Sequence, residues 1–267
     1  MNVFKDDAIP LTHKEIEITD IKSLELLKEK RPDTIINTAA FHRVDDAEDT
    51  PEKAYMINSI GQRNVAKVAV EIGAIPVYIS TDYVFDGEKN GPYTEVDVPN
   101  PVNTYGLSKL NGEIYTKNLS KRYYIFRVAS LFGVAGSSGK GGNFVETMIK
   151  KAKNNEKIRV VDDMIMSPTY TENAAKIMKE IITNELPYGI YHITNSGYCS
   201  WFEFTRQILE YTNLKVDIKP IKTVELKMKA KRPQFSALTS PRLEKYGLKM
   251  PNWRDALRDY LEKKGHL

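Results

Sequence analysis

Tyr105 and Lys109 form the pair of side chains in this sequence that is best placed to do chemistry. They stand four residues apart in Tyr105-Gly-Leu-Ser-Lys109, so on a helix they share one face. A phenol titrates near ~10, and a cation within about 4–6 Å favours the phenolate and lowers that pKa. The spacing predicts that Tyr105 is a proton donor whose pKa is lowered by the Lys109 ammonium. An exposed helix pair without a catalytic role is the competing interpretation.

Thr81 is a third residue whose position suggests a place in such a site. It stands 24 residues before Tyr105 and closes the apolar run that begins at Ile75. A run of this kind is typical of a buried parallel strand. Because ligands of open α/β sheets bind at the carboxyl ends of the strands, we expect the Thr81 hydroxyl to face the same site as Tyr105.

Several further motifs occur in a fixed order around these residues. They are Arg31-Pro32-Asp33 before Ile35-Ile36-Asn37-Thr38-Ala39-Ala40, Val44-Asp45-Asp46-Ala47-Glu48, Ser80-Thr81-Asp82-Tyr83-Val84-Phe85-Asp86-Gly87, Asn103-Thr104-Tyr105-Gly106-Leu107-Ser108-Lys109, and Arg232-Pro233. Together they resemble the dTDP-4-dehydrorhamnose reductases, which belong to the extended short-chain dehydrogenase/reductases. The resemblance extends from about residue 8 to the C-terminus, and motifs in order are far more specific than any one of them.

The resemblance implies a reaction and a set of site residues. It implies that NADPH or NADH reduces the C4 ketone of a dTDP-4-dehydro-6-deoxysugar, converting dTDP-4-dehydrorhamnose to dTDP-L-rhamnose for nucleotide-sugar and cell-surface polysaccharide biosynthesis. Tyr105 would donate the proton, Lys109 would lower its pKa and bind the nicotinamide ribose, and Thr81 would hydrogen-bond the carbonyl oxygen. The cofactor side would include Ala39, Ala40, Phe41 and Asn58, and the substrate side Val44, Asp82, Tyr83, Asn143 and Arg232.

The resemblance further implies that two regions bind phosphate groups. The guanidinium of Arg232, in a basic-Arg-Pro motif with Ser236, suits a diphosphate because its donors form a fork. Lys140 and the backbone amides from Gly141 to Asn143 are expected to contact the substrate diphosphate at a helix N-terminus. Gly133-Val134-Ala135-Gly136-Ser137-Ser138-Gly139 also has the spacing of a dinucleotide-binding loop, but it follows the Tyr105-Lys109 pair, whereas such a loop lies in the first βα turn.

The fold class expected is α/β, a Rossmann-like doubly wound parallel sheet with a smaller C-terminal substrate lobe. Residues 1–267 would form one NAD(P)-binding domain, with a discontinuous lobe drawn mainly from 133–157, 164–170 and 195–240. The family begins with a strand and a glycine-rich turn that this sequence lacks, so we expect a truncated gene model or a fragment. Strands are predicted near 8–12, 34–39, 75–80, 123–128, 158–161 and 190–193, and helices near 21–30, 50–72, 103–119, 143–153, 170–184, 200–212 and 253–264.

Composition narrows the class of protein. The net charge of +4, from 39 basic and 35 acidic residues, is too balanced to imply a nucleic-acid partner. A single cysteine, Cys199, excludes an internal disulfide and fits a reducing cytoplasm. There is no apolar run of about 18 residues, so no membrane partner is expected, and the four histidines lack metal-ligand spacing. The expected partner is a nucleotide-sugar substrate, and a homodimer is left open.

Other functions in the same superfamily share the Tyr-Lys pair. One alternative is a non-catalytic sugar-nucleotide and NADP-binding protein like the regulatory subunit of methionine adenosyltransferase. Another is a nucleotide-sugar epimerase. Two departures from the family pattern, Ser130 where many rhamnose-forming relatives have tryptophan and Glu17 near the adenosine position, leave the particular sugar and the choice between NADH and NADPH open.

Overall fold

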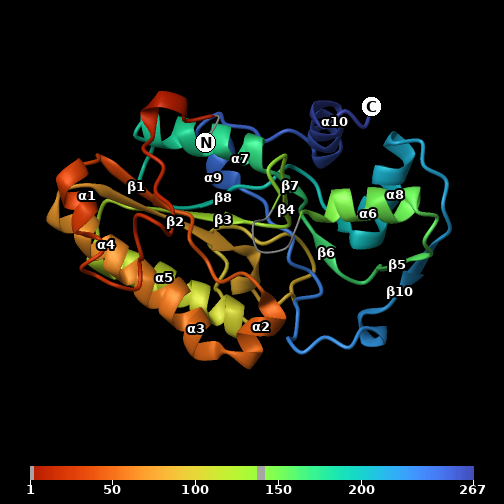
Figure 1. Cartoon of the computed structure of the whole chain (residues 1–267), viewed down its shortest axis with the longest axis horizontal. Helices are drawn as coiled ribbons and strands as arrows, with labels where there is room; N and C mark the ends of the chain where they lie inside the picture. The colour runs from red at the N-terminus through yellow and green to blue at the C-terminus, as the bar shows by residue number, and fades with distance from the viewer. Residues whose placement is uncertain (1–2, 137–141) are drawn as a thin grey trace.

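A four-stranded parallel sheet forms the centre of the molecule. The computed structural model describes residues 3–136 and 142–267 (Figure 1). In spatial order the strands are β1 (Thr34–Asn37), β2 (Ile75–Thr81), β3 (Tyr124–Val128) and β8 (Gly189–His192). Neighbouring strands pair in parallel, with Val77 opposite Tyr124 and Ile125 opposite Ile190. The expected α/β class with a parallel sheet is confirmed.

Helices cover both faces of this sheet, as a doubly wound fold requires. Figure 1 shows α3, α4 and α5 on one side and α7 and α9 on the other. Their bounds are α3 (Pro51–Tyr55), α4 (Gln62–Glu71), α5 (Thr104–Leu119), α7 (Thr171–Thr183) and α9 (Pro241–Lys245), with α1 (Glu25–Lys30) beside α4 and α2 (Val44–Asp49) before α3. The helix predicted over 50–72 is interrupted by a π-helical turn, Met56–Gly61; α2 and α9 were not predicted.

A second core lies to one side, around α6, α8 and α10. Buried side chains from these helices, including Phe204 and Trp253, pack there with Phe132 from a short strand. The elements are α6 (Phe144–Lys153), α8 (Trp201–Tyr211), α10 (Trp253–Lys263), and the two-stranded sheets β4 (Leu131–Phe132) with β7 (Thr169–Tyr170), β6 (Ile165–Met166) with β9 (Cys199–Ser200), and β5 (Ile158–Val161) with β10 (Ile218–Ile221). Short 3-10 turns occur at Lys5–Asp7, Asp82–Val84 and Thr223–Glu225.

Two of the predicted strands are placed differently. The strand predicted at 8–12 is wrong: these residues are not in a strand, Ile9 is 62% exposed, and Leu11 packs beside α4 in the cluster of Ile18 and Val65. Pro10 has no N–H to give to a sheet ladder. The strand at 158–161 exists, but it pairs with β10 in the second core and not with the central sheet.

A buried ion pair ties α5 to the sheet. Glu113 on α5 accepts hydrogen bonds from Arg127 on β3, Nε to Oε1 at 2.9 Å and Nη2 to Oε2 at 2.7 Å, and both side chains are 2% exposed. Ser80 on β2 adds a third bond to the carboxylate at 2.5 Å. Arg127 also lies 3.4 Å from His192 on β8, and burial, aided by the Arg127 charge, lowers the pKa of this histidine to about 3. The pair therefore joins one helix to three strands.

Removing one partner of this pair should be costly. Glu113→Ala leaves the Arg127 guanidinium buried without a counter-charge, and we expect the free energy of unfolding to fall by about 3–5 kcal/mol. The double variant Glu113→Leu with Arg127→Met should lose much less, because neither charge remains. Urea unfolding measures both. The control is Glu71→Ala, which breaks an exposed pair with Lys28 and should cost below about 1 kcal/mol. Equal losses in the buried and exposed variants would contradict this account.

Candidate active site

The candidate site lies where β2 ends and α5 begins. Thr81 is the last residue of β2 and caps the 3-10 turn that follows, accepting a hydrogen bond from the Tyr83 N–H at 3.2 Å. Its hydroxyl donates to Oδ1 of Asp82 at 3.0 Å. Asn103 caps α5 by accepting from the Gly106 N–H at 2.8 Å. The strand that ends at Thr81 and the helix that begins after Asn103 both lie where the sequence predicts them.

Two glycines let α5 approach β2 more closely than any other residue would. A Cβ on Gly106 would lie 2.1 Å from the carbonyl oxygen of Tyr83. A Cβ on Gly112 would lie 2.5 Å from the backbone oxygen of Asn58 and from the Tyr78 hydroxyl. Backbone and hydroxyl atoms cannot give way at such distances, so only glycine fits at these two places. The sequence analysis gave these glycines no role.

Tyr105 is brought against Thr81 and Tyr83 by this packing. Its ring meets the Tyr83 ring edge to face, with centroids 5.9 Å apart, and the Thr81 side chain acts on the pKa of its hydroxyl. Burial raises the pKa of Tyr105 to about 12, against the opposing effect of the Thr81 side chain, and the nearby Asp82 carboxylate raises it further. The expected lowering of this pKa by Lys109 is therefore wrong for the chain by itself, because desolvation dominates.

Lys109 faces a different set of partners. Its ammonium nitrogen donates to the backbone oxygen of Ile79 at 2.5 Å and lies 4.1 Å from the centre of the Tyr78 ring. The residue is 2% exposed. Burial lowers the pKa of Lys109 to about 7, and the charge of Glu113 offsets part of that effect. Lys109 thus changes its charge near neutral pH, which a solvated lysine does not do.

Asn58 holds the chain segment that follows β1. Its Oδ1 accepts from the Phe41 N–H at 2.8 Å, and its Nδ2 donates to the Phe41 oxygen at 3.0 Å and to Ser108 Oγ at 2.9 Å. The side chain is fully buried in the π-helical turn, a local geometry that is common at functional sites. Because both ends of the amide are used inside the protein, Asn58 positions Phe41, and with it Ala39 and Ala40, instead of presenting its own side chain.

Asp82 is a buried carboxyl with spare hydrogen-bonding capacity. It is 4% exposed, and its Oδ2 accepts from none of the residues that the structure describes. Burial raises the pKa of Asp82 to about 6, while hydrogen bonds from Ser236 and Thr81 work in the opposite direction. A buried carboxylate oxygen without a partner is costly, so a hydroxyl of a bound sugar would satisfy a group that the fold leaves open.

Arg232 reaches this group from the C-terminal part of the chain. Its charge opposes the rise in pKa that burial causes at the Tyr83 hydroxyl, and it makes a forked pair with Asp45 in α2, at 3.1 Å and 2.8 Å. Val44 is half-buried at the start of the same helix. The structure thus gathers Thr81, Asp82, Tyr83, Tyr105 and Arg232. The sequence reasoning gave Asp45 no role of its own, although it stands in the motif Val44-Asp45-Asp46-Ala47-Glu48.

Asn143 is held within the second core. Its Oδ1 caps α6 by accepting from the Glu146 N–H at 3.0 Å, and its Nδ2 donates to the Gly133 oxygen and to the Tyr260 hydroxyl, both at 2.9 Å. The Asn143 side chain is therefore used in structural contacts, and the predicted contact of its backbone N–H with substrate stays a prediction. Of the other residues in that prediction, Lys140 and Gly141 lie outside the described residues, and Gly142 lies within them.

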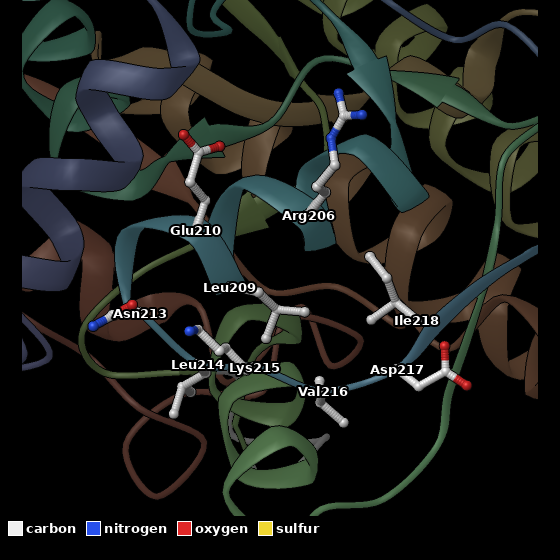
Figure 2. Close-up of a pocket in the computed structure, with 9 residues that line it drawn as sticks. All are labelled: Arg206, Leu209, Glu210, Asn213, Leu214, Lys215, Val216, Asp217 and Ile218. Carbon is white, nitrogen blue, oxygen red and sulfur yellow. The ribbon is translucent and has the colours of Figure 1, made fainter.

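Two hollows mark the surface. One, of about 550 Å³, adjoins the candidate site and is lined by Asp86, Gly87 and the segment from Thr223 to Gln234, including Arg232. The other, of about 730 Å³, lies at the end of α8, where Figure 2 shows Arg206 and Glu210 on the helix and Val216 on the segment that leads to β10. The hollow at the end of α8 is not lined by any residue of β2 or α5, so it is not part of the candidate site.

The sequence is similar to one family along nearly its whole length. A family model described as the RmlD substrate binding domain matches residues 3–265. A dTDP-4-dehydrorhamnose reductase from Aggregatibacter actinomycetemcomitans is 33% identical over 269 aligned residues, covering 95% of this chain and 89% of that protein. The chain belongs to the dTDP-4-dehydrorhamnose reductase family. The resemblance identified from the motifs is confirmed.

Two further proteins are more similar still to this chain. The spore coat polysaccharide biosynthesis protein SpsK of Bacillus subtilis is 40% identical, with 97% of this chain and 89% of that protein covered. The crystal structure of dTDP-4-dehydrorhamnose reductase from Bacillus anthracis, in complex with NADP, superposes with a TM-score of 0.91 at 41% identity, covering 96% of this chain and 90% of that one. Family membership and fold therefore agree.

Neither a metal-binding cluster nor a membrane-spanning helix is found among the described residues. No group of three or more side chains suited to a metal ion is present in the described ranges. None of the helices described is long and apolar enough to cross a membrane.

The low pKa of Lys109 makes a prediction about stability. In the folded chain this pKa is about 7, below that of the unfolded chain, so between the two values the unfolded chain binds more protons and stability rises with pH. Lys109→Met removes the cost of the buried charge. We expect the variant to gain stability over the wild type at about pH 6, and this advantage to shrink by roughly 3–4 kcal/mol at about pH 10.

Urea unfolding of both proteins at the two pH values measures this difference. The control is Lys67→Met, because Lys67 is an exposed residue of α4. An advantage for Lys109→Met that is the same at both pH values would show that the ammonium is not desolvated in the folded chain.

Proposed function

We propose that the protein reduces the C4 ketone of a dTDP-4-dehydro-6-deoxysugar with NADPH, forming dTDP-L-rhamnose from dTDP-4-dehydrorhamnose. The observation that carries this proposal is the position of Tyr105, packed against Tyr83 and close to the Thr81 side chain, one helical turn before the buried Lys109. Proteins at 33–41% identity named as this reductase support the choice of substrate and cofactor. Its product would serve nucleotide-sugar and cell-surface polysaccharide biosynthesis.

The residues near β1 and Lys109 fit a nicotinamide nucleotide. Ala39, Ala40 and Phe41 are half-buried, and Asn58 fixes the backbone of Phe41. Among the described residues the Lys109 ammonium donates a hydrogen bond to the Ile79 oxygen, so two of its three donors are available to ribose hydroxyls. We propose that these residues hold the nicotinamide end of NADPH. When bound, NADPH supplies the hydride.

Tyr105 supplies the proton in this mechanism. As negative charge develops on the C4 oxygen, the phenol gives its proton to that oxygen. The high pKa of Tyr105 means that it is protonated at neutral pH and ready to donate. The Thr81 hydroxyl can turn its single proton from Asp82 toward the same oxygen or toward the phenolate that remains. Lys109, one helical turn along α5, stabilises that phenolate when it is charged.

The proposed substrate-binding groups lie near Thr81 and Tyr105. Asp82 has a buried oxygen without a partner, which suits a sugar hydroxyl. Tyr83 and Val44 would border the sugar, and the 550 Å³ hollow beside Arg232 would take the nucleotide part. We propose that the second core, with 133–157, 164–170 and 195–240, forms the substrate lobe. A cytoplasmic location and a homodimer stay predictions.

The test is turnover with the defined substrate. NADPH oxidation should depend on dTDP-4-dehydrorhamnose and match the dTDP-L-rhamnose formed, molecule for molecule. Binding of NADPH and dTDP without turnover would instead indicate a non-catalytic binding protein. An epimerase would interconvert sugar nucleotides, retain bound oxidised cofactor and consume no NADPH.

Tyr105→Phe separates the acid role from binding. Because this change removes only the phenolic proton, we expect kcat to fall by about 10²–10⁴, with the dissociation constant of NADPH changed less than about twofold. Stopped-flow kinetics and fluorescence titration measure the two quantities. The matched control is Tyr115→Phe on the same helix, which should leave both near wild type. An unchanged kcat in Tyr105→Phe would remove Tyr105 from the mechanism.

A further inference from the structure

A short basic segment is tied to α2 from far along the chain. We name residues 229–232 the strap; the segment supplies Lys229, Ala230, Lys231 and Arg232. Lys229 donates to both oxygens of Asp49 at 2.7 Å and 2.6 Å, and the Ala230 N–H donates to Oδ1 of Asp45 at 3.0 Å. Asp45 and Ala230 are 185 residues apart. Two acidic residues of one helix therefore hold the strap through a backbone and a side-chain contact.

The guanidinium of Arg232 is largely used by the protein itself. Nη1 donates to Asp45 Oδ1 at 3.1 Å and to the Ala230 oxygen at 3.3 Å, and Nη2 donates to Asp45 Oδ2 at 2.8 Å. The Arg232 charge also acts on the Tyr83 hydroxyl, where it opposes the rise in pKa that burial causes. Arginine has five N–H donors, and the three hydrogen bonds to Asp45 and Ala230 use much of this capacity inside the protein. The side chain is 15% exposed, which leaves little of it for a ligand.

The same helix holds the start of α5. Glu48 accepts from the Thr104 N–H and from the Thr104 hydroxyl, each at 2.8 Å. Asn103, the cap of α5, donates to the Lys231 oxygen at 2.8 Å. The strap, α2 and the first turn of α5 are thus bonded to one another in a closed triangle. Whatever moves Arg232 also moves the surroundings of Tyr105.

Tyr83 connects the strap to Tyr105, the proposed proton donor, because Arg232 acts on the Tyr83 hydroxyl. Tyr83 packs its ring against the Tyr105 ring, with centroids 5.9 Å apart and planes at 71°. Arg232 lowers the pKa of the Asp45 carboxyl through its hydrogen bonds, so both members of the forked pair are charged at neutral pH. A diphosphate that bound Arg232 through the fork would have to displace Asp45, at the cost of leaving a carboxylate without its partner.

We propose that Asp45 and Arg232 form a latch, in which Arg232 is a positioning residue that holds Tyr83 against Tyr105 and is not the ligand of the substrate diphosphate. The inference rests on the proposed reductase function, and it replaces the role that the sequence resemblance implied for Arg232. The two roles predict opposite effects of Asp45. If Arg232 is part of a latch, neutralising Asp45 lowers kcat. If Arg232 binds the diphosphate, neutralising Asp45 frees its guanidinium for the ligand.

The test compares Asp45→Asn, Arg232→Lys and the double variant. Arg232→Lys keeps the charge and removes the fork. For a latch, we expect each single variant to lower kcat by roughly tenfold through misplacement of Tyr105, the double variant to be no worse than either single one, and the dissociation constant of dTDP to change less than about threefold. Asp49→Asn, which breaks only the exposed Lys229 pair, should stay within about twofold of wild type.

A role as diphosphate ligand gives a different pattern. Arg232→Lys would then weaken dTDP binding by more than about tenfold with kcat unchanged, and Asp45→Asn would leave binding equal or tighter. That result overturns the latch. If the wild type is active and Asp45→Asn has the same kcat, the latch is overturned as well.

A readout without turnover keeps the latch apart from the proposed function. In protein labelled with ¹³C at the tyrosine ring carbon that bears the hydroxyl, Tyr83→Phe and Tyr105→Phe assign the two signals. Both signals should shift in Asp45→Asn and in Arg232→Lys but not in Asp49→Asn. Signals that stay in place in the first two variants would overturn the latch even if the wild type proved to have no reductase activity.

Discussion

The close approach of α5 to the carboxyl end of β2 is the constraint on which the site depends. Gly106 and Gly112 permit it, because any side chain there would collide with the backbone of Tyr83 or Asn58. Three residues spaced four apart then face the sheet from one side of the helix. Tyr105 meets Thr81, Lys109 meets Ile79 and Tyr78, and Glu113 meets Ser80 and Arg127. A shift of the helix would disturb all three contacts together.

Desolvation sets the protonation states in this arrangement more than direct ion pairing does. Burial keeps Tyr105 protonated and brings the pKa of Lys109 down to about 7. The neighbouring carboxylate, Glu113, is bonded to Arg127 and cannot serve Lys109 as a close partner. Burial thus keeps Tyr105 protonated. Lys109 stabilises the developing Tyr105 phenolate only while Lys109 is itself protonated.

The sequence was informative where local chemistry decides. The apolar run from Ile75 identified β2, and the strand predicted at 123–128 and the helix predicted at 103–119 match β3 and α5. The sequence was uninformative where the structure or role of a segment depends on a partner far along the chain. Residues 8–12 have an apolar pattern but no strand to pair with, and 158–161 pairs with β10 instead of the central sheet. Arg232 had the type of a diphosphate ligand, yet its forked partner is Asp45, 187 residues away. No spacing rule connects two such residues.

The most direct test of the central claim follows the hydride itself. The protein is supplied with dTDP-4-dehydrorhamnose and NADPH that carries deuterium at nicotinamide C4, with a matched reaction for each face of the ring, and the sugar is analysed by NMR. The account predicts deuterium at C4 of dTDP-L-rhamnose from one of the two labelled cofactors, and none in a reaction with Tyr105→Phe over the same brief interval. A sugar that changes configuration without gaining deuterium, or a wild-type reaction that forms no reduced sugar, would contradict the account.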